Sequence, residues 1–281
     1  MDSPNFHFIS GLPRSGSTLL SAILRQNPRF VAGMTSPVGA LVSAVLNQLS
    51  AGGEHSNVVG REKRKELVQA LFKAYYSEVK PGQIVFDTNR MWCARLPFLE
   101  DLFPKVKVIA CVRNVAWVMD SFERLYRSNP YEFTRLFSNA GGRSTIYSRL
   151  EGLAQHDQTV GFAWSALREA FYSPHAGSLL IVDYDLLCQA PKNVLGLIYQ
   201  FLEEDWFEHD FDNVDYSTPE FDEPLGVPQL HTVRPKVAAE ARRTILPPDL
   251  FEKYSQMSFW TETSGSAAHV IAPKQSMKES M

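Results

Sequence analysis

A run of glycine, serine and threonine near the N-terminus has the residue types and spacing of a loop that binds phosphate. Residues 11–18, GLPRSGST, follow the Walker A spacing, with Ser17 in the place of the usual lysine. Glycines let the backbone close around an oxyanion, successive N–H groups then point inward, and the following helix N-terminus adds partial positive charge. We therefore expect this loop to bind a phosphate or sulfate group.

The missing lysine separates this loop from those that act on nucleoside triphosphates. In those proteins the lysine reaches the β and γ phosphates, while the next Ser or Thr holds Mg²⁺. Here Arg14 supplies the positive charge, and Asp87 and Asp183 are the nearest candidates for an acidic metal ligand. Neither is a convincing one, so the sequence favours metal-independent transfer of an anionic group. A helix-capping turn without a ligand is the structural alternative.

A second cation stands where a predicted strand meets a predicted helix. Arg113 follows the apolar run 108–112, and Ser121 lies eight residues further on. An arginine at the carboxyl end of a strand lies in the crevice where open α/β sheets bind ligands, and its planar fork suits phosphate. Because Ser121 is two helical turns away, both side chains can grip one phosphate only if the arginine reaches along the helix. A salt-bridged structural arginine is the alternative.

Together these segments resemble the PAPS-dependent sulfotransferase family over residues 6–260. Residues 13–18, PRSGST, are similar to the family's 5′-phosphosulfate-binding loop, and Arg113 with Ser121 matches the second family signature in type and spacing. Residues 182–187, VDYDLL, are a weaker likeness to its Y-E-D-L segment. The Pro-Arg-Ser-Gly run is closer to the bacterial and tyrosylprotein-type branches than to the cytosolic aryl and steroid branch.

The resemblance implies an enzyme that moves a sulfuryl group from PAPS directly, in line, to a hydroxyl or amine acceptor. The product is adenosine 3′,5′-bisphosphate (PAP), and neither a metal nor a covalent enzyme intermediate is expected. The resemblance assigns cofactor binding to the loop, the second signature and a late basic loop: Pro13, Arg14, Ser15, Gly16, Ser17, Thr18, Arg113, Ser121, Arg234 and Lys236. For the last two residues a solvated basic turn is the alternative. A Mg²⁺-dependent P-loop kinase and a non-catalytic PAP-binding or anion-binding module are the rival functions.

Sulfuryl transfer builds negative charge on the bridging oxygen of the leaving phosphate, and a nearby cation stabilises that charge. Arg14 and Arg90 are the candidate catalytic cations. The pair Asn89-Arg90 is similar to an Asn-Lys pair of the tyrosylprotein branch. A surface ion pair with Asp87 would also account for Arg90.

The general base is assigned from chemical type alone. The acidic pair that the tyrosylprotein branch carries after its first helix is absent from residues 33–36, GMTS, which argues against a tyrosyl acceptor. His231 is the candidate base, because it lies in an irregular segment beside two cations and its pKa range suits the role. Asp87 is the competing base, and an exposed, idle histidine is the structural alternative.

An α/β fold is expected to position these residues, with a P-loop-type, mainly parallel, twisted sheet flanked by helices on both faces. Continuous apolar runs predict buried strands over residues 6–10, 84–86, 106–112 and 179–182. Helical periodicity alternates with these runs. It predicts helices over residues 17–27, 37–50, 63–79, 114–128 and 191–202, and a further helix that ends near residue 103.

The remaining segments define the predicted domain and acceptor pocket. Residues 129–149 read as a mobile loop or lid, 207–237 as irregular chain, and 263–281 as a frayed tail behind one sulfotransferase-like domain, 1–262. We expect the helices 37–50 and 63–79 and the segment 129–149 to shape the acceptor pocket. Their aromatic residues suit an apolar or amphipathic acceptor, or alternatively pack in the core: Tyr75, Tyr76, Tyr131, Phe133 and Tyr147.

Composition excludes several classes of protein. The chain has 281 residues, of which 44% are hydrophobic and 21% charged, so it is neither disordered nor a coiled coil. Its net charge of −3 argues against a general nucleic-acid binder. The three cysteines have no metal-like spacing, and no secretory signal or long apolar stretch is present. We therefore expect a cytoplasmic protein without a membrane span.

Overall fold

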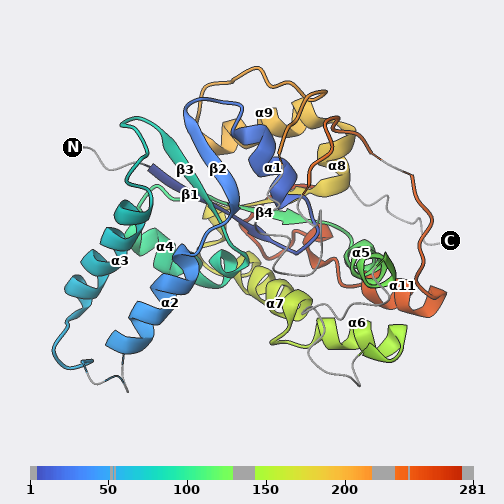
Figure 1. Ribbon diagram of the computed structural model, residues 1–281, viewed down its shortest axis with the longest axis horizontal. Coiled ribbons are helices and arrows are strands. Elements are labelled where there is room, and N and C mark those ends of the chain that lie inside the picture. The colour runs from blue at the N-terminus through green and yellow to red at the C-terminus, as the bar shows by residue number, and fades with distance from the viewer. Residues whose placement is uncertain are drawn as a thin grey trace.

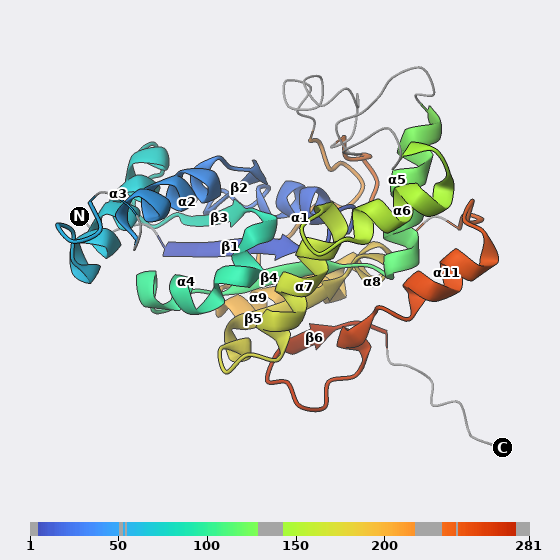
Figure 2. The same cartoon turned by 90° about the horizontal axis from the view of Figure 1, so that it is seen from below.

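A parallel sheet forms the centre of the protein. The computed structural model describes residues 5–50, 53, 55–128, 143–216, 232–239 and 241–273. Across these residues six strands lie in the order β2-β3-β1-β4-β5-β6, and each neighbouring pair is parallel. The strands are β1 (Asn5–Gly11), β2 (Phe30–Thr35), β3 (Ile84–Thr88), β4 (Val108–Val112), β5 (Leu179–Asp183) and β6 (His269–Ile271). Figure 2 shows β3, β1, β4, β5 and β6 stacked in this order. The predicted fold class is confirmed.

Helices cover both faces of the sheet, as Figure 1 shows. They are α1 (Ser17–Leu24), α2 (Val38–Leu49), α3 (Arg61–Tyr75), α4 (Leu96–Leu102), α5 (Val115–Ser128), α6 (Ile146–Ala154), α7 (Thr159–Phe171), α8 (Tyr184–Gln189), α9 (Pro191–Leu202) and α11 (Pro248–Ser255). Three short 3-10 helices complete the set over the described residues: η1 (Arg90–Arg95), η3 (Ala176–Ser178) and η5 (Phe259–Thr261). No helix of the described chain is long and apolar enough to cross a membrane.

Two hydrophobic cores follow from this layering. Helices α2 to α7 and α11 pack on one face of the sheet, where Phe8, Phe72 and Trp92 are fully buried. Helices α1, α8 and α9 pack on the other face around Ile9 and Ile23. The alternation of Phe8 and Ile9 between the two cores is the two-residue period of a strand buried on both sides. This burial accounts for the continuous apolar runs that predict the central strands.

Two edge strands were not predicted. Only Phe30 of β2 is buried, and the strand contains Gly33, so it lacks the continuous apolar run of a central strand. Strand β6 has three residues, of which only Ile271 is buried. It pairs with β5, so the sheet continues past residue 262, where we expected a frayed tail to begin. An edge strand has one neighbour and little burial, and both strands lack the pattern that marks strands in a sequence.

The predicted lid is partly wrong. Residues 129–142 lie outside the described part of the chain, but α6 begins at Ile146, inside the expected loop. Its first turn is closed by a capping box between Thr145 and Ser148. Helix α7 was also absent from the prediction, although its buried Val160, Leu167 and Phe171 recur at helical spacing. These helices pack on the core beside η1 and α5.

The carboxyl ends of the strands meet at one edge of the sheet, which is where parallel α/β sheets bind ligands. Strand β1 leads into the glycine-rich loop, β3 into Arg90, β4 into Arg113 and β5 into α8. In the register, Gly11 at the end of β1 faces Cys111 of β4. The topology therefore gathers the predicted site residues from these distant segments at one place.

Candidate active site

The loop between β1 and α1 has the backbone of an anion cradle. Gly16 precedes α1 with a φ of 89°, and Arg14 adopts a φ of 59°, so both lie in the left-handed region. Gly16 has no side chain to cap the first turn of α1, so the amide groups of that turn are left for a ligand. By contrast, Asn114 and Asp183 cap the helices that follow β4 and β5 with their side chains. Of these three helix N-termini, the first is the one built for an anion.

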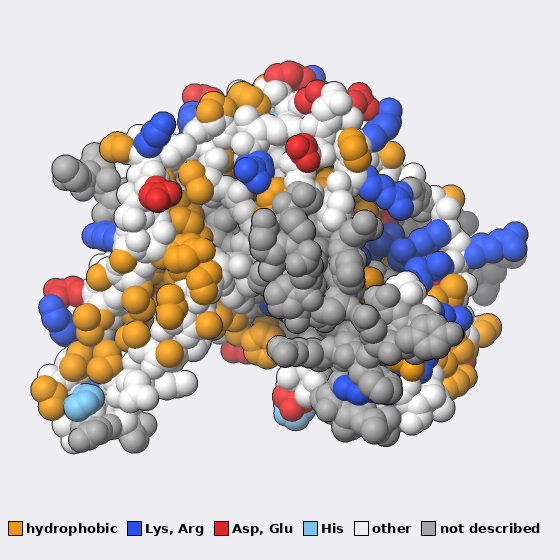
Figure 3. Space-filling model, viewed as in Figure 1, with side chains coloured by type: hydrophobic (Ala, Val, Ile, Leu, Met, Phe, Trp, Pro, Cys, Tyr) orange, Lys and Arg blue, Asp and Glu red, His pale blue; other side chains and the backbone are white. Residues whose placement is uncertain are grey.

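This loop opens into a cavity of about 500 Å³, within the usual size range of ligand pockets. Six cationic side chains from four parts of the chain line it: Arg14, Arg90, Arg113, and three from the stretch 234–242, namely Arg234, Lys236 and Arg242. Asp185 is the one acidic residue among the described residues that line it. Figure 3 shows basic side chains gathered on the side of the molecule where α5 and α11 lie. A ligand with several negative charges suits this cavity.

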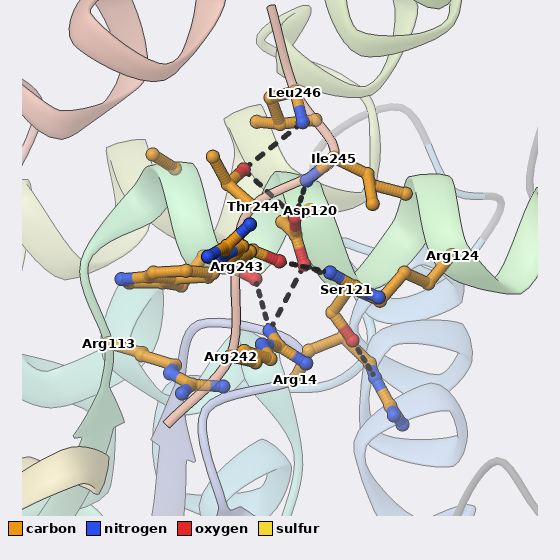
Figure 4. Close-up of polar contacts among 12 residues, drawn as sticks. Arg14, Arg113, Asp120, Ser121, Arg124, Arg242, Arg243, Thr244, Ile245 and Leu246 are labelled. Atoms are coloured by element: carbon orange, nitrogen blue, oxygen red, sulfur yellow. Dashed lines mark hydrogen bonds and ion pairs between the residues drawn. The ribbon is translucent and has the colours of Figure 1, made fainter. Parts of the chain in front are cut away.

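Arg14 lies across the cavity against α5. Its Nε donates a hydrogen bond of 3.1 Å to Oγ of Ser121, which is 107 residues away in the sequence. Figure 4 shows the Arg14 side chain beside Ser121. The loop arginine and the serine of the second signature therefore share one site, as their assignment to one cofactor requires.

Arg113 pairs with an acidic residue in the same cavity. Its Nε and Nη2 donate to the two carboxylate oxygens of Asp185, at 3.3 Å and 2.7 Å, and its guanidinium lies 4.5 Å from the centre of the Tyr184 ring. These are the hydrogen bonds that Arg113 donates within the described chain, and its side chain lines the cavity. Arg113 and Ser121 line one cavity, but each contacts a different partner in this structure.

The comparison with known sequences decides the family. A sequence profile described as "Sulfotransferase family" matches residues 7–208, which is well over half of the chain. The chain belongs to the sulfotransferase family. No curated protein matches this sulfotransferase in sequence.

Solved structures share the fold of this sulfotransferase. The sulfotransferase domain of the Synechococcus olefin synthase is 18% identical, with a TM-score of 0.50, covering 91% of this chain and 95% of its own. The sulfotransferase domain of the curacin biosynthetic pathway is also 18% identical, with a TM-score of 0.50 and coverage of 92% and 93%. A Mycobacterium avium sulfotransferase is 14% identical, with a TM-score of 0.51 and coverage of 96% and 79%. At these identities the likeness concerns the fold.

Asp87 lies in the core of this sulfotransferase and not in the wall of the cavity. Its carboxylate is fully buried and accepts hydrogen bonds from Ser36, from the Tyr76 hydroxyl at 2.6 Å and from Trp92 Nε1 at 2.7 Å. Burial raises the pKa of Asp87, and these bonds oppose the rise. Arg90 makes no ion pair with it among the described residues and instead lines the cavity. The alternative of a surface Arg90–Asp87 pair is therefore wrong, and Asp87, the competing base, does not line the cavity.

The structure describes the part of the late basic loop that contains Arg234 and Lys236. Arg234 and Lys236 are exposed and line the cavity, and Lys236 pairs with Asp212 at 2.9 Å. His231, the candidate base, lies outside the described residues. The same holds for Tyr131 and Phe133 of the expected acceptor pocket.

The other predicted acceptor-pocket aromatics do not line this cavity. Tyr75, Tyr76 and Tyr147 are absent from the described residues that surround it. Tyr76 packs edge-to-face against Phe6 and donates to Asp87, and Tyr147 is exposed and donates to Asp249. The alternative of packing therefore holds for Tyr76, because its hydroxyl is used by the buried carboxylate.

Arg242 is a site residue that the sequence prediction missed. Its guanidinium lies 5.1 Å from the centre of the Trp117 ring, with Arg113 at 6.0 Å from the same centre. Burial lowers the pKa of Arg242, and the charge of Arg113 lowers it further. The Arg-Arg pair at 242–243 was the available signal. Nothing local in that sequence shows that one of the two residues reaches the cavity.

Proposed function

We propose that this sulfotransferase uses PAPS as donor and transfers the sulfuryl group directly, in line, to a hydroxyl or amine of an acceptor, releasing PAP. The observation that carries the proposal is the cavity where the uncapped N-terminus of α1, Arg113 and Ser121 meet. The donor carries a 5′-phosphosulfate and a 3′-phosphate, and this cavity offers the amide groups at the start of α1 for one and the Arg113 and Ser121 side chains for the other. Such a division suits a nucleotide with a 3′-phosphate as well as a 5′-phosphosulfate.

In this proposal the loop, residues 13–18, holds the 5′-phosphosulfate with its amide groups. Arg113 and Ser121 hold the 3′-phosphate through charge-assisted and hydroxyl hydrogen bonds. Arg234 and Lys236 add positive charge at the cavity rim, where they are exposed to solvent. No step in this assignment needs a metal ion.

The transfer step needs positive charge at the bridging oxygen and removal of the acceptor proton. Arg14 and Arg90 are the cations proposed to stabilise the leaving phosphate. Partial burial lowers the pKa of Arg90, but an arginine side chain stays charged in proteins. His231 is proposed to take the acceptor proton. A small-molecule or peptide acceptor, the bacterial or tyrosylprotein-like branch and a cytoplasmic location stay predictions.

The first test is ligand-induced stabilisation. PAP at 100 times its dissociation constant should stabilise the fold by about 2.7 kcal/mol, and ATP at the same concentration should give a much smaller thermal shift. The difference is expected because ATP lacks the 3′-phosphate that Arg113 and Ser121 would bind. Equal thermal shifts for the two nucleotides would contradict the assignment.

Incubation with labelled PAPS and pools of phenols, alcohols and amines then tests the reaction itself. Labelled sulfate esters or sulfamates are the expected products. Binding of PAP without transfer to any acceptor would favour a non-catalytic module. Mg²⁺-dependent turnover of ATP would favour a phosphotransferase.

Replacing His231 by alanine tests the proposed base. The turnover number should fall about 100-fold, because general-base catalysis contributes 10²–10⁴-fold, while the dissociation constant of PAP changes only a few-fold. In the unmodified enzyme the rate should fall as the pH drops below about 6.5, the ordinary pKa of histidine. His55→Ala, at an exposed histidine, is the control. Near-normal turnover and an unchanged pH profile in His231→Ala would dismiss this base.

A further inference from the structure

A fully buried carboxylate lies next to Ser121 on α5. Asp120 accepts hydrogen bonds from Arg124 Nε at 2.7 Å, from the Ile245 backbone N–H at 2.8 Å and from Thr244 Oγ1 at 3.0 Å. Nη2 of Arg242 lies 3.4 Å from the same carboxylate. Figure 4 shows how these groups converge on Asp120. Arg124 belongs to α5, and the other three partners lie in residues 242–246, which we call the late segment.

These bonds fix the late segment to the helix. Thr244 Oγ1 donates to Asp120 and also accepts from the Leu246 N–H at 3.1 Å, so a tight turn closes on the carboxylate. A buried charge is costly unless it is paired and hydrogen-bonded, and this one has several partners. Burial would raise the pKa of Asp120, but the hydrogen bonds and the charge of Arg242 outweigh it, so the pKa lies below its ordinary value. The carboxylate is therefore ionised at neutral pH.

The charge of Asp120 also bears on the position of Arg242. Arg242 and Arg113 lie at the same Trp117 ring, so two guanidinium groups share one wall of the cavity. Like charges that lie close together repel each other, and the charge of Arg113 lowers the pKa of Arg242 accordingly. The negative charge behind Arg242 offsets this repulsion, and the hydrogen bond from Arg242 to the Trp117 carbonyl, at 3.4 Å, completes its attachment.

We propose that Asp120 is a positioning residue for recognition of the 3′-phosphate: it holds Arg242 beside Arg113 and keeps the late segment on α5. This inference rests on the proposed function, because it supposes that Arg113 and Ser121 bind that phosphate. Arg242 is then a third donor to the same group. Because Arg242 lines the cavity and Asp120 does not, Asp120 acts on the phosphate only through that arginine.

The test compares PAP with 5′-AMP, which has the same nucleoside and 5′-phosphate but no 3′-phosphate. Asp120→Asn keeps the shape and one acceptor oxygen but removes the charge behind Arg242. We expect the dissociation constant of PAP to rise at least tenfold and that of 5′-AMP to change less than threefold, both measured by titration calorimetry. The preference for PAP should fall accordingly.

A matched control lies one turn further along α5. Glu123 is also fully buried, and it pairs with Arg149 and Arg127 rather than with Arg242. Glu123→Gln therefore perturbs a comparable buried carboxylate on the same helix. It should lower the melting temperature but leave the ratio of the PAP and 5′-AMP dissociation constants within twofold of the wild-type ratio.

Arg242→Gln provides a second variant in case Asp120→Asn fails to fold. It removes the proposed phosphate donor and leaves Asp120 in place, and it should give the same loss of preference. The double variant should lose no more preference than either single one, because both changes break one chain of contacts. Preference retained in Asp120→Asn or in Arg242→Gln, or a fully additive loss in the double variant, would overturn the inference. A wild-type protein that does not prefer PAP would instead refute the proposed function.

Discussion

Replacing Arg113 by alanine is expected to raise the dissociation constant of PAP about 100-fold or more, since truncating one partner of a desolvated charge pair costs roughly 2–5 kcal/mol. The side chain is only 13% exposed, so little water screens its interaction with a bound phosphate. The same change should abolish the preference for PAP over 5′-AMP. Titration of both nucleotides measures both effects.

Arg127→Ala is the matched control for this experiment. Arg127 is also an arginine of the α5 region, but it pairs with Glu123 and its side chain is half exposed. Its loss should leave the affinity for PAP and the preference over 5′-AMP near the wild-type values. If Arg113→Ala still prefers PAP, then the 3′-phosphate binds elsewhere and the second family signature is misassigned.

The second large effect is expected at Gly11. This residue has a φ of 103°, and an added Cβ would lie 2.2 Å from the carbonyl oxygen of Cys111 and 2.6 Å from its nitrogen. Both atoms belong to the backbone of β4, which pairs with β1 at this position. The neighbour cannot move without breaking the central strand pairing. Gly11→Ala should therefore lower the free energy of unfolding by about 3 kcal/mol or more, through combined backbone strain and overpacking.

Urea denaturation of Gly11→Ala and of a second glycine variant checks this expectation. Gly152 lies in α6, and an added Cβ there would meet nothing within 4 Å. Gly152→Ala should stabilise the protein by up to about 1 kcal/mol, because alanine is the better helix former. A Gly11→Ala protein with wild-type stability would mean that the end of β1 does not have the backbone described here.

The parts of the site that could be predicted from the sequence are those encoded locally. The glycine-rich loop lies within eight residues, and Arg113 directly follows a buried strand, so both are visible without knowledge of the fold. Arg242 could not be found in this way, because its place in the cavity depends on contacts with Trp117 and Asp120 that span more than 100 residues. The pairing of Arg113 with Asp185 likewise joins the ends of two strands that only the sheet brings together.

The errors in the fold have a related cause. Burial on both faces produced clear apolar runs in the central strands, while β2 and β6 at the edges had no such signal. The acceptor pocket was predicted from aromatic residues, and an aromatic side chain in a core has the same sequence signature as one in a pocket. Tyr76 illustrates this, because its ring packs on Phe6 and its hydroxyl serves Asp87.

The strand order has a consequence for how the protein acquires its fold. Strand β1 pairs with no strand near it in the sequence: its partners are β3, which begins at Ile84, and β4, which ends at Val112. During synthesis Gly11 therefore cannot pair with Cys111 until β4 has left the ribosome. Strand β6, which begins at His269, can pair with β5 only later still. Such non-local pairing slows folding, and the strand edges stay unpaired until their partner strands arrive. We expect refolding to be slow and the unfinished sheet to be the state most prone to aggregation.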